Sequence, residues 1–410
     1  MTSFETLYNN PQAARRRAEA LAQNLPRGSS YPVRFFSAPG RTELGGNHTD
    51  HNNGKVIAAA VNLDSLAAVL QHDERCVIFH STGYPEVVVD LNHLEPDSAE
   101  EGTTEALIRG IAAAFEAGGT PVSGWQAYAD SQVPGGSGLS SSAVVEVLIG
   151  RIFDNLYGKA ARSALEIAQI GQKAENQYFG KPSGLMDQAA CACGGVVLID
   201  FADPLHALLE PVPFDLSEAG LSLCIVRTSG NHADLTPDYA AISHEMKAVA
   251  AFFGKKVLQE LTAPQILARA KELSAHLGDR AVLRALHFFN ENKRVEAMKE
   301  ALNRRDMSRY LALVNESGDS SWELLQNVSS SAHPASKQSI ALALALTRQF
   351  LGAGSAGACR VHGGGFAGTI QTYLPSKQVP AYREYMDALF GAGAVTELKI
   401  RRWGVVELQG

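Results

Sequence analysis

The sequence predicts a chain of two domains in which α-helices and β-strands are mixed. Its 410 residues suit about two domains. With 45% hydrophobic and 19% charged residues, the chain has enough apolar side chains to bury large cores. Strand-like and helical runs share the first half, mostly helical sequence follows from about 237 to 352, and strands return after 356. We expect the domain boundary near 203–215, which gives domains of 1–207 and 208–410.

Composition and charge exclude several classes of protein. The net charge is −7 and basic residues form no long run, which argues against nucleic-acid binding. No apolar stretch approaches the ~20 residues of a membrane span, and the arginines at 15–17 interrupt any signal peptide. Five cysteines without metal-type spacing predict buried free thiols in a cytoplasmic protein. The oligomeric state stays open, and a monomer is compatible with the sequence.

The first half is predicted to begin with a helix over residues 4–25, because its apolar residues form one stripe. A strand over 31–37 should end at a Pro39-Gly40 turn. Further strand-like runs and a helix lead to the centre of this half. The predicted strands are 56–61, 65–70, 76–80, 87–91 and 125–131, and the helix is 103–117.

Residues 133–143 form a loop that is rich in glycine and serine and lies at the centre of the predicted site. An apolar run follows at once, which indicates a helix that starts near Ser140–Ser142. Glycines let backbone amides approach an anion, and a glycine loop before a helix N-terminus suits a phosphate. A flexible loop with a serine cap is the alternative that composition alone leaves open.

Later elements bring in further polar candidates. Ser163 and Glu166 fit a capping box, and the helix that they open carries Glu175 near its far end. A helix start at Pro182 and Ser183 would place Asp187 in a first turn. Strands are expected at 194–201, 221–227, 356–361, 369–374 and 394–400, and helices at 255–261, 263–277 and 380–389.

Two loops remain that these elements do not explain. Residues 41–54 hold an arginine, two histidines and three asparagines, so this loop can hydrogen-bond several hydroxyls of a polyol, unless it is a solvated turn. Residues 363–368 (GGGFAG) match the spacing G-x-G-x-x-G. We reject a dinucleotide fingerprint there, because the sequence that follows reads as a strand and the fingerprint needs a helix.

Four segments together resemble the GHMP small-molecule kinases, and within them the galactokinases. Residues 38–41 (APGR) with 45–50 (GGNHTD) are similar to the galactokinase signature, and 134–143 (PGGSGLSSSA) to the nucleotide-phosphate loop. Residues 360–368 (RVHGGGFAG) are similar to the third glycine-rich motif, and 184–188 (GLMDQ) to the catalytic segment. The resemblance implies an α+β fold with a ribosomal-S5-like N-terminal domain, a ferredoxin-like C-terminal domain and a cleft between them.

The resemblance also implies a sugar 1-kinase that transfers phosphate from ATP to galactose with the help of Mg²⁺. Arg41 and Asp187 would be the catalytic pair, and Ser142 and Glu175 would hold the Mg²⁺. The ATP phosphates would lie on Gly136, Ser137, Gly138, Leu139, Ser140, Ser141, Ser142, Gly364 and Gly365. The sugar would lie on Asn47, His48, Thr49, Asp50, Gly184 and Tyr239. Structural roles are the alternatives: a helix-turn carboxylate for Asp187, an ion pair for Arg41, a surface acid for Glu175 and a tight turn for 363–368.

Three positions depart from the family's pattern. Asn47 stands where the family has a sugar-contacting glutamate, and His51 stands where it usually has tyrosine. Asparagine is neutral, so galacturonate or a modified galactose is an alternative substrate. His362 replaces a small or polar residue, and we assign it no role. A second alternative is a catalytically silent sensor of sugar and ATP, but the complete Ser140–Ser142 run favours an enzyme.

Overall fold

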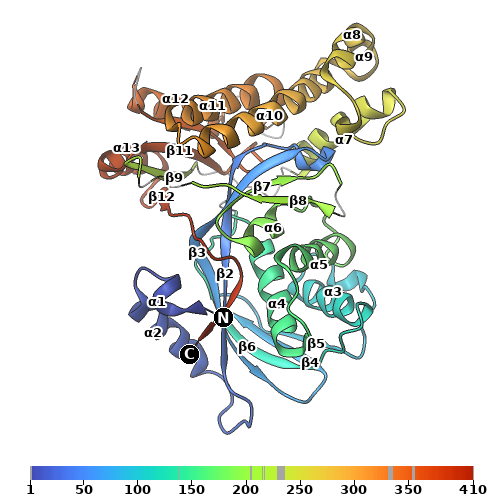
Figure 1. Ribbon diagram of the computed structural model, residues 1–410, viewed down its shortest axis with the longest axis vertical. Helices are drawn as coiled ribbons and strands as arrows, with labels where there is room; N and C mark the ends of the chain where they lie inside the picture. Colours follow the sequence, from blue (N-terminus) through green and yellow to red (C-terminus); the bar gives the residue numbers. More distant parts are fainter. Residues whose placement is uncertain are drawn as a thin grey trace.

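The computed structural model describes residues 2–409 except 137, 204–205, 215, 217, 229–235, 331–335 and 353–355. Two sheets and their covering helices form an elongated molecule (Figure 1). The larger sheet lies mainly in its lower part, and most C-terminal helices lie above that sheet. The predicted α+β fold class is confirmed. In the described residues the longest apolar helices are too short or too polar to cross a membrane.

The larger sheet has nine strands within the described residues, in the order β1-β13-β2-β3-β6-β4-β5, while β7 pairs with β3 and β8 with β7. Its strands are β1 (Thr2–Ser3), β2 (Arg34–Gly45), β3 (Lys55–Gln71), β4 (Cys76–Ser81), β5 (Val87–Asp90), β6 (Trp125–Ser131), β7 (Val196–Asp200), β8 (Leu208–Pro211) and β13 (Val406–Gln409). The last strand of the chain therefore lies beside β2. The division at 207/208 stays a prediction.

Helices cover both faces of this sheet because successive side chains of a strand point to opposite faces. On β3, Leu66, Ala68 and Leu70 pack against α1 (Phe4–Leu7) and α2 (Pro11–Ala22). Ala67 and Val69 belong instead to the main core. The helices of that face are α3 (Thr104–Ala117), α4 (Ser141–Tyr157), α5 (Ala164–Gln177) and α6 (Met186–Cys193). Of these, α4 and α6 contact β2 and β3 directly, which places their first turns next to β2.

The smaller sheet is antiparallel and runs in the order β10-β11-β9-β12. Its strands are β9 (Leu221–Arg227), β10 (Ala358–His362), β11 (Thr369–Pro375) and β12 (Val395–Leu398). The helices α12 (Ser339–Leu351) and α13 (Val379–Phe390) pack on one side of it through an apolar cluster. On the other side, α11 (Met307–Ser320) lies against β10. The hydroxyl of Tyr310 on α11 forms a hydrogen bond of 2.9 Å with that of Tyr373 on β11.

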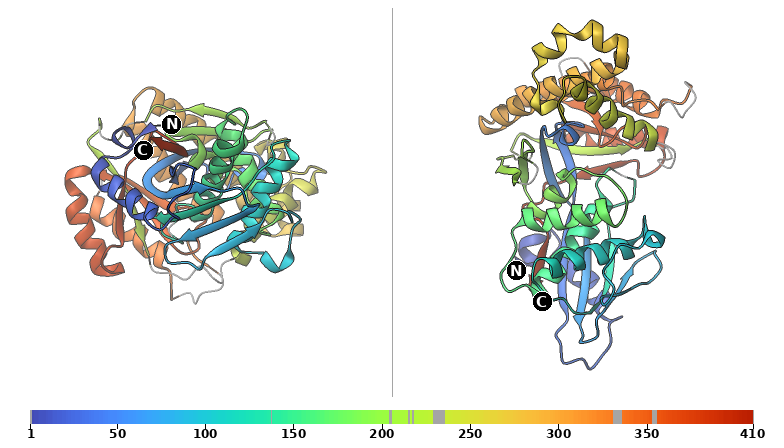
Figure 2. Two further views of the ribbon diagram at one scale, coloured as in Figure 1. Left: turned by 90° about the horizontal axis from the view of Figure 1, so that it is seen from below. Right: turned by 90° about the vertical axis from the view of Figure 1, so that its right-hand side faces the viewer.

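A helical layer spans the upper end of the molecule (Figure 2, right). It consists of α7 (Thr236–Phe252), α8 (Ala263–Ala268), α9 (Ala270–Leu277) and α10 (Asp279–Asn303). These helices share a core of their own, in which Ile242, Met246 and Phe288 are fully buried. Because α10 also contacts β2 and β3, this layer is joined to the larger sheet at the end where the site lies.

The structure differs from the predicted elements at several places. The helix expected over 4–25 is two helices, because Asn10 caps the second one and Pro11 starts it. Pro39-Gly40 does not end a strand: β2 continues to Gly45 with a register shift between Pro39 and Arg41. The runs 56–61 and 65–70 form one strand, β3. The segment 255–261 is helical only in a 3-10 turn at Leu258–Glu260, and 263–277 breaks at Arg269.

Candidate active site

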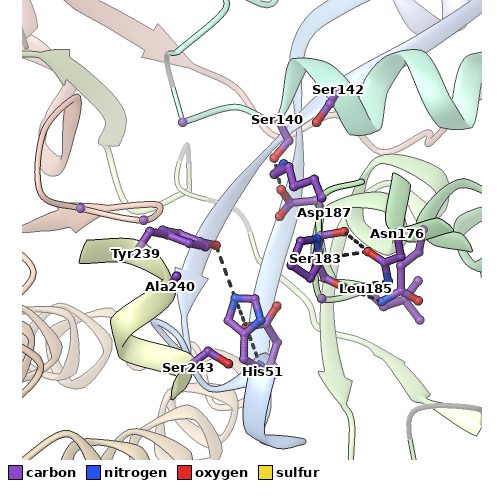
Figure 3. A pocket seen from close by; sticks show the side chains of 18 of the residues that line it. His51, Ser140, Ser142, Asn176, Ser183, Leu185, Asp187, Tyr239, Ala240 and Ser243 are labelled. Carbon is purple, nitrogen blue, oxygen red and sulfur yellow. Dashed lines mark hydrogen bonds and ion pairs between the residues drawn. The ribbon is translucent and has the colours of Figure 1, made fainter. Parts of the chain in front are cut away.

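A cavity of about 1000 Å³ lies where α6, α7, the loop before α4 and the turn after β10 meet. Residues from all four predicted motifs line it, and Figure 3 shows Tyr239 and Ser243 of α7 across it from Asp187 and Ser140. Its lining includes Arg41, Asp50, His51, Gly136, Gly138, Ser140, Ser141, Ser142, Gly184, Asp187, Tyr239, His362, Gly364 and Gly365. The segments that sequence similarity singled out thus converge on one cavity.

Arg41 and Asp187 form the polar centre of this cavity. The Arg41 Nε lies 2.7 Å from Asp187 Oδ1, and a second guanidinium nitrogen donates to the Gly138 carbonyl. The Ser140 hydroxyl donates to the other oxygen of Asp187. Asp187 keeps 30% of its side-chain surface exposed, whereas Arg41 is buried. Asp187 is therefore held by two fixed donors while its carboxylate faces the cavity.

The charge of Asp187 follows from these partners. Burial by itself raises the pKa of its carboxyl, but attraction to Arg41 and the hydrogen bonds from Arg41 and Ser140 outweigh burial and hold the pKa below its usual value. Burial likewise lowers the pKa of Arg41, and Asp187 more than compensates and raises it. Both groups are ionised at neutral pH, so the cavity presents a carboxylate beside a fixed cation.

The phosphate-loop candidates lie where a helix start meets the cavity. The helix α4 begins at Ser141, as the serine run predicted, and Ser140 precedes it with a left-handed φ of 59°. The loop contacts β2, because the Arg41 amide donates to the Leu139 carbonyl at 3.1 Å. Leu139 itself is fully buried and does not line the cavity. Ser137 lies outside the described residues.

Glycines of the third motif permit two close approaches on the opposite side of the cavity. A Cβ on Gly364 would lie 2.7 Å from the Tyr239 ring, and one on Gly365 would lie 2.2 Å from the Asn327 carbonyl. Residues 363–368 join β10 to β11, so the segment is also a turn between strands. A strand and not a helix follows it, which agrees with the rejection of a dinucleotide fingerprint. At Gly365, which has a φ of 78°, only glycine fits without moving the backbone, whereas a side chain at Gly364 would have to displace the Tyr239 ring.

An oxygen-rich cluster lies beneath Ser142. Its hydroxyl is 3.4 Å from Glu175 Oε1, and Lys181 Nζ is 2.8 Å from the same oxygen. The Ser183 hydroxyl and the Gln188 amide, the latter at 2.9 Å, bind the other oxygen of Glu175. The hydroxyl and carboxylate are hard oxygen donors of the kind that Mg²⁺ prefers. Sequence reasoning missed the partner Lys181, which lies six residues beyond Glu175 but meets it only after the chain turns.

The predicted sugar residues divide into two groups. Asp50, Gly184 and Tyr239 line the cavity, and a Cβ on Gly184 would lie 2.1 Å from Asp50 Oδ2. Asn47 and Thr49 are fully buried and lie outside the lining.

His48 is nearly buried, and its Nε2 donates to the Gly364 carbonyl at 2.9 Å. Burial and the nearby His51 lower the pKa of His48 to about 3, so its ring is neutral. His51 lines the cavity, 3.4 Å from the Tyr239 hydroxyl.

A buried polar network explains the position of Asn47. Its amide nitrogen donates to the Gly363 carbonyl at 2.9 Å and lies 3.3 Å from Glu43, while Asn327 donates to its oxygen at 2.9 Å. Glu43 forms an ion pair with Arg360 at 2.6 Å, and both side chains are buried. Sequence reasoning did not identify Glu43 or Arg360. The available signal was Arg360, a charged residue between Cys359 and Val361 in a short strand-like run.

His362, which received no role from sequence, joins three motifs. Its Nε2 lies 2.9 Å from the Thr42 hydroxyl, and its Nδ1 lies 3.1 Å from that of Thr369. A Cβ on Gly138 would lie 2.8 Å from the ring, so the imidazole supports the phosphate loop. Burial and the nearby Arg41 and Arg360 lower the pKa of His362 well below its usual value, which keeps it neutral.

We expect His362→Ala to raise the KM for ATP about tenfold, with a smaller change in the KM for sugar. The substitution leaves a void beside Gly138 and removes one hydrogen-bond partner from each of two hydroxyls, which costs about 0.5–1.5 kcal/mol per bond, while the Thr42 hydroxyl keeps its bond from Gln371. Steady-state kinetics with each substrate varied in turn measure both constants, and His206→Ala, at an exposed histidine, is the control. Equal changes in the two constants would contradict a specific support of the phosphate loop.

Comparison with known proteins agrees with this geometry. The family model of the GHMP kinases N terminal domain matches residues 106–195, and the galactokinase galactose-binding signature matches residues 27–70. A galactokinase of Glaesserella parasuis is 32% identical over 352 residues, which are 85% of this chain and 86% of that protein. The chain belongs to the galactokinase family.

Further galactokinases and solved structures agree with that assignment. A galactokinase of Streptomyces coelicolor is 30% identical over 89% of this chain and 90% of its own length. The crystal structure of Lactococcus lactis galactokinase complexed with galactose superposes with a TM-score of 0.80 at 23% identity, over 96% of this chain and 99% of that one. Methanococcus jannaschii mevalonate kinase gives a TM-score of 0.63 at 16% identity, over 92% and 99%. At these identities the two structures show the shared fold.

Proposed function

We propose that this chain is a galactokinase that transfers the γ-phosphate of ATP to the C1 hydroxyl of galactose. Membership of the galactokinase family supports the reaction class and the substrate. The observation on which the residue roles rest is the assembly of Arg41, Asp187 and Ser140 at one cavity with the loop before α4. A cytoplasmic location is supported by five free thiols.

Asp187 orients the C1 hydroxyl and accepts its proton as the oxygen attacks the γ-phosphorus. The bond from phosphorus to the bridging oxygen of ADP breaks as the new bond to the sugar oxygen forms. Phosphoryl transfer has a loose transition state, so positioning and charge stabilisation matter more than a strong base. Arg41 keeps Asp187 ionised and places a cation beside the transferring group. Backbone amides at the start of α4 are suited to the nucleotide phosphates.

Ser142 and Glu175 are the residues that would hold Mg²⁺, because a hydroxyl and a carboxylate oxygen lie 3.4 Å apart there. Ser142 lines the cavity, whereas Glu175 is buried directly behind it and does not. Bound Mg²⁺ supplies charge neutralisation for the phosphate oxygens. Lys181 pairs with Glu175 at 2.8 Å in the structure, so Mg²⁺ would share or replace this cationic partner.

We expect Glu175→Gln to raise the Mg²⁺ concentration for half-maximal activity by about tenfold to a hundredfold, because a charged oxygen ligand is lost. The matched control is Glu146→Gln. Glu146 lies on α4 and shares Gln188 with Glu175, and burial together with Glu175 raises its pKa well above the usual value, so the exchange for glutamine changes less charge at Glu146. A Mg²⁺ titration of both variants distinguishes them, and an unchanged requirement in Glu175→Gln would exclude it as a ligand.

Asn47 gives no ground for preferring galacturonate. A site for a uronate would need asparagine to remove the negative charge near the sugar, but the Glu43 carboxyl lies 3.3 Å from the Asn47 amide. We propose that Asn47 positions the sugar loop through Gly363 and Asn327, while Asp50, Gly184, His51 and Tyr239 face the sugar. The assembled Arg41–Asp187 pair favours an enzyme over a silent sensor.

A coupled assay of ADP release with Mg·ATP tests the substrate and the enzyme together. We expect release with galactose and at most slow release with galacturonate or glucose. A large preference for the uronate would overturn the substrate, and binding of galactose and ATP without ADP release would favour the sensor.

A further inference from the structure

The turn between β3 and β4 brings three potential metal ligands together, far from the cavity. The side chains are His72, Glu74 and Cys76, whose ligand atoms all lie within 4.8 Å of one another. The Cys76 sulfur is 3.8 Å from Glu74 Oε2. We propose that His72, Glu74 and Cys76 bind one Zn²⁺ ion at this turn, with a solvent molecule as the fourth ligand.

His72 gives an independent indication of a missing partner. Both of its ring nitrogens are buried and lack a hydrogen-bond partner among the described residues. A buried polar group without a partner is costly, so such atoms are normally satisfied by protein, water or an ion. A metal ion bound between His72, Glu74 and Cys76 would satisfy one ring nitrogen of His72 without any change of the backbone.

The backbone holds the three side chains in place. The His72 amide donates to the Gly124 carbonyl at 3.2 Å, and both β3 and β4 pair with β6, which lies between them and begins at Trp125. A Cβ on Gly124 would lie 2.4 Å from the His72 ring and 2.1 Å from the Glu74 carbonyl. The turn therefore crosses directly over Gly124.

The two residues between the ligands are engaged elsewhere. The Tyr31 hydroxyl donates to Asp73 at 2.5 Å, and Arg75 binds the carbonyls of Val122 and Leu91 at 3.0 and 2.9 Å. Glu74 has no ion pair among the described residues, because Arg75 pairs with Glu116 at 3.1 Å. The Glu74 carboxylate, the His72 imidazole and the Cys76 thiol therefore face one another.

The donor set selects the metal. Thiolate and imidazole favour Zn²⁺ over Mg²⁺ or Ca²⁺, and Zn²⁺ binds sulfur at about 2.3 Å and nitrogen or oxygen at about 2.0–2.2 Å. Tetrahedral ligands at those lengths are roughly 3.3–3.8 Å apart, so the cluster needs to contract by only about 1 Å. Binding replaces the proton of the Cys76 thiol, which passes to the solvent.

The site is structural and separate from catalysis. Arg41 pairs with Ala60 of β3, whereas Gln71 ends the same strand, on the order of 35 Å farther along it. Figure 1 shows β4 in the lower part of the molecule and α7, which lines the cavity, in the upper part. Zn²⁺ at the turn between β3 and β4 is therefore expected to raise the melting temperature and to leave galactose phosphorylation unchanged.

Titration of the chelator-treated full chain with Zn²⁺, and with Co²⁺ as a spectroscopic substitute, tests the proposal. We expect one equivalent of Zn²⁺, a thiolate-to-cobalt charge-transfer band, and a rise in melting temperature with Zn²⁺. Cys76→Ser should abolish the band and weaken Zn²⁺ binding at least about tenfold, whereas Cys193→Ser, at another half-buried thiol, should change neither.

His72→Gln is the second variant, in case Cys76→Ser does not fold, and should weaken Zn²⁺ binding equally. The proposal is overturned if the wild-type chain binds no Zn²⁺ outside the Mg²⁺ site, or if binding survives in Cys76→Ser. Neither result bears on the kinase reaction, which is measured separately with Mg·ATP.

Discussion

Replacement of Asp187 by asparagine should lower kcat about a thousandfold while galactose and ATP still bind. Asparagine has nearly the same shape, but it carries no negative charge and cannot accept the proton of the C1 hydroxyl. General-base catalysis contributes about 10²–10⁴-fold, and the loss of charge also releases Arg41 from its partner at 2.7 Å. Steady-state kinetics give kcat, and titration calorimetry gives the two dissociation constants.

Asp187→Ala separates charge from geometry in the same experiment. It removes the acceptor of both the Arg41 and the Ser140 hydrogen bonds, so Arg41 is left as an unpaired buried cation. We expect an equal or larger loss of kcat, accompanied by a larger loss of stability than in Asp187→Asn, which also lacks the charge but keeps an oxygen acceptor. Near-normal turnover in either variant would remove Asp187 from the reaction.

The depressed pKa of Asp187 predicts the acid side of the pH profile. Because Arg41 and Ser140 hold this pKa below its usual value, the carboxylate stays ionised until the pH falls below about 3.9, the value of an unperturbed aspartate. The kcat of the wild-type chain should therefore show no acid limb from Asp187 between neutrality and that pH, within the range where the chain stays folded.

The second large effect concerns stability. Arg360→Met should destabilise the fold by about 3–5 kcal/mol, because it leaves the buried Glu43 carboxyl without its cation. Arg360 also donates to the Glu43 carbonyl at 2.8 Å and to Ser317 at 3.2 Å, so its loss reaches both β2 and α11. Urea unfolding gives the free energy of unfolding. Because Glu43 also contacts Asn47 in the predicted sugar loop, we expect a rise in the KM for galactose as a second readout.

The destabilisation in Arg360→Met should grow with pH. Burial already raises the pKa of Glu43, against the opposing effect of Arg360. Without the arginine that pKa rises further, so the folded state binds more protons than the unfolded state and stability falls as pH rises, by up to about 1.4 kcal/mol per pH unit. The double variant Glu43→Gln with Arg360→Met should recover much of the loss and remove the pH dependence. A loss that is independent of pH and not recovered would show that packing, not charge, dominates.

Local signals in the sequence predicted the parts of the site that depend on neighbouring residues. The serine run predicted the start of α4, and Ser163 predicted the capping box of α5, whose hydrogen bonds lie within three residues of the chain. The expected cap of α4 is absent, because Ser140 donates to Asp187 instead. Asp187 does lie in the first turn of α6, but this helix starts at Met186 and not at Pro182 and Ser183. The strand expected to stop at Pro39 shows the limit of such signals, because β2 accommodates the proline with a register shift.

The remaining parts depend on pairs that are distant in sequence. Glu43 and Arg360 are 317 residues apart, and neither pattern nor composition indicates which buried charge meets which. The same holds for Asn47, whose burial follows from Asn327 and Gly363 rather than from its own loop. The asparagine in place of the family's glutamate suggested a change of substrate because the sequence did not indicate that the Glu43 carboxyl lies beside it.

The most direct test of the account is to identify the product formed from galactose and Mg·ATP by phosphorus–proton correlation NMR. The account predicts galactose 1-phosphate, with the phosphorus coupled to the anomeric proton, formed in equal amount to ADP and lost in Asp187→Asn. Phosphate at any other hydroxyl, or an unchanged yield in that variant, would contradict the arrangement of Arg41, Asp187 and the phosphate loop around the anomeric oxygen.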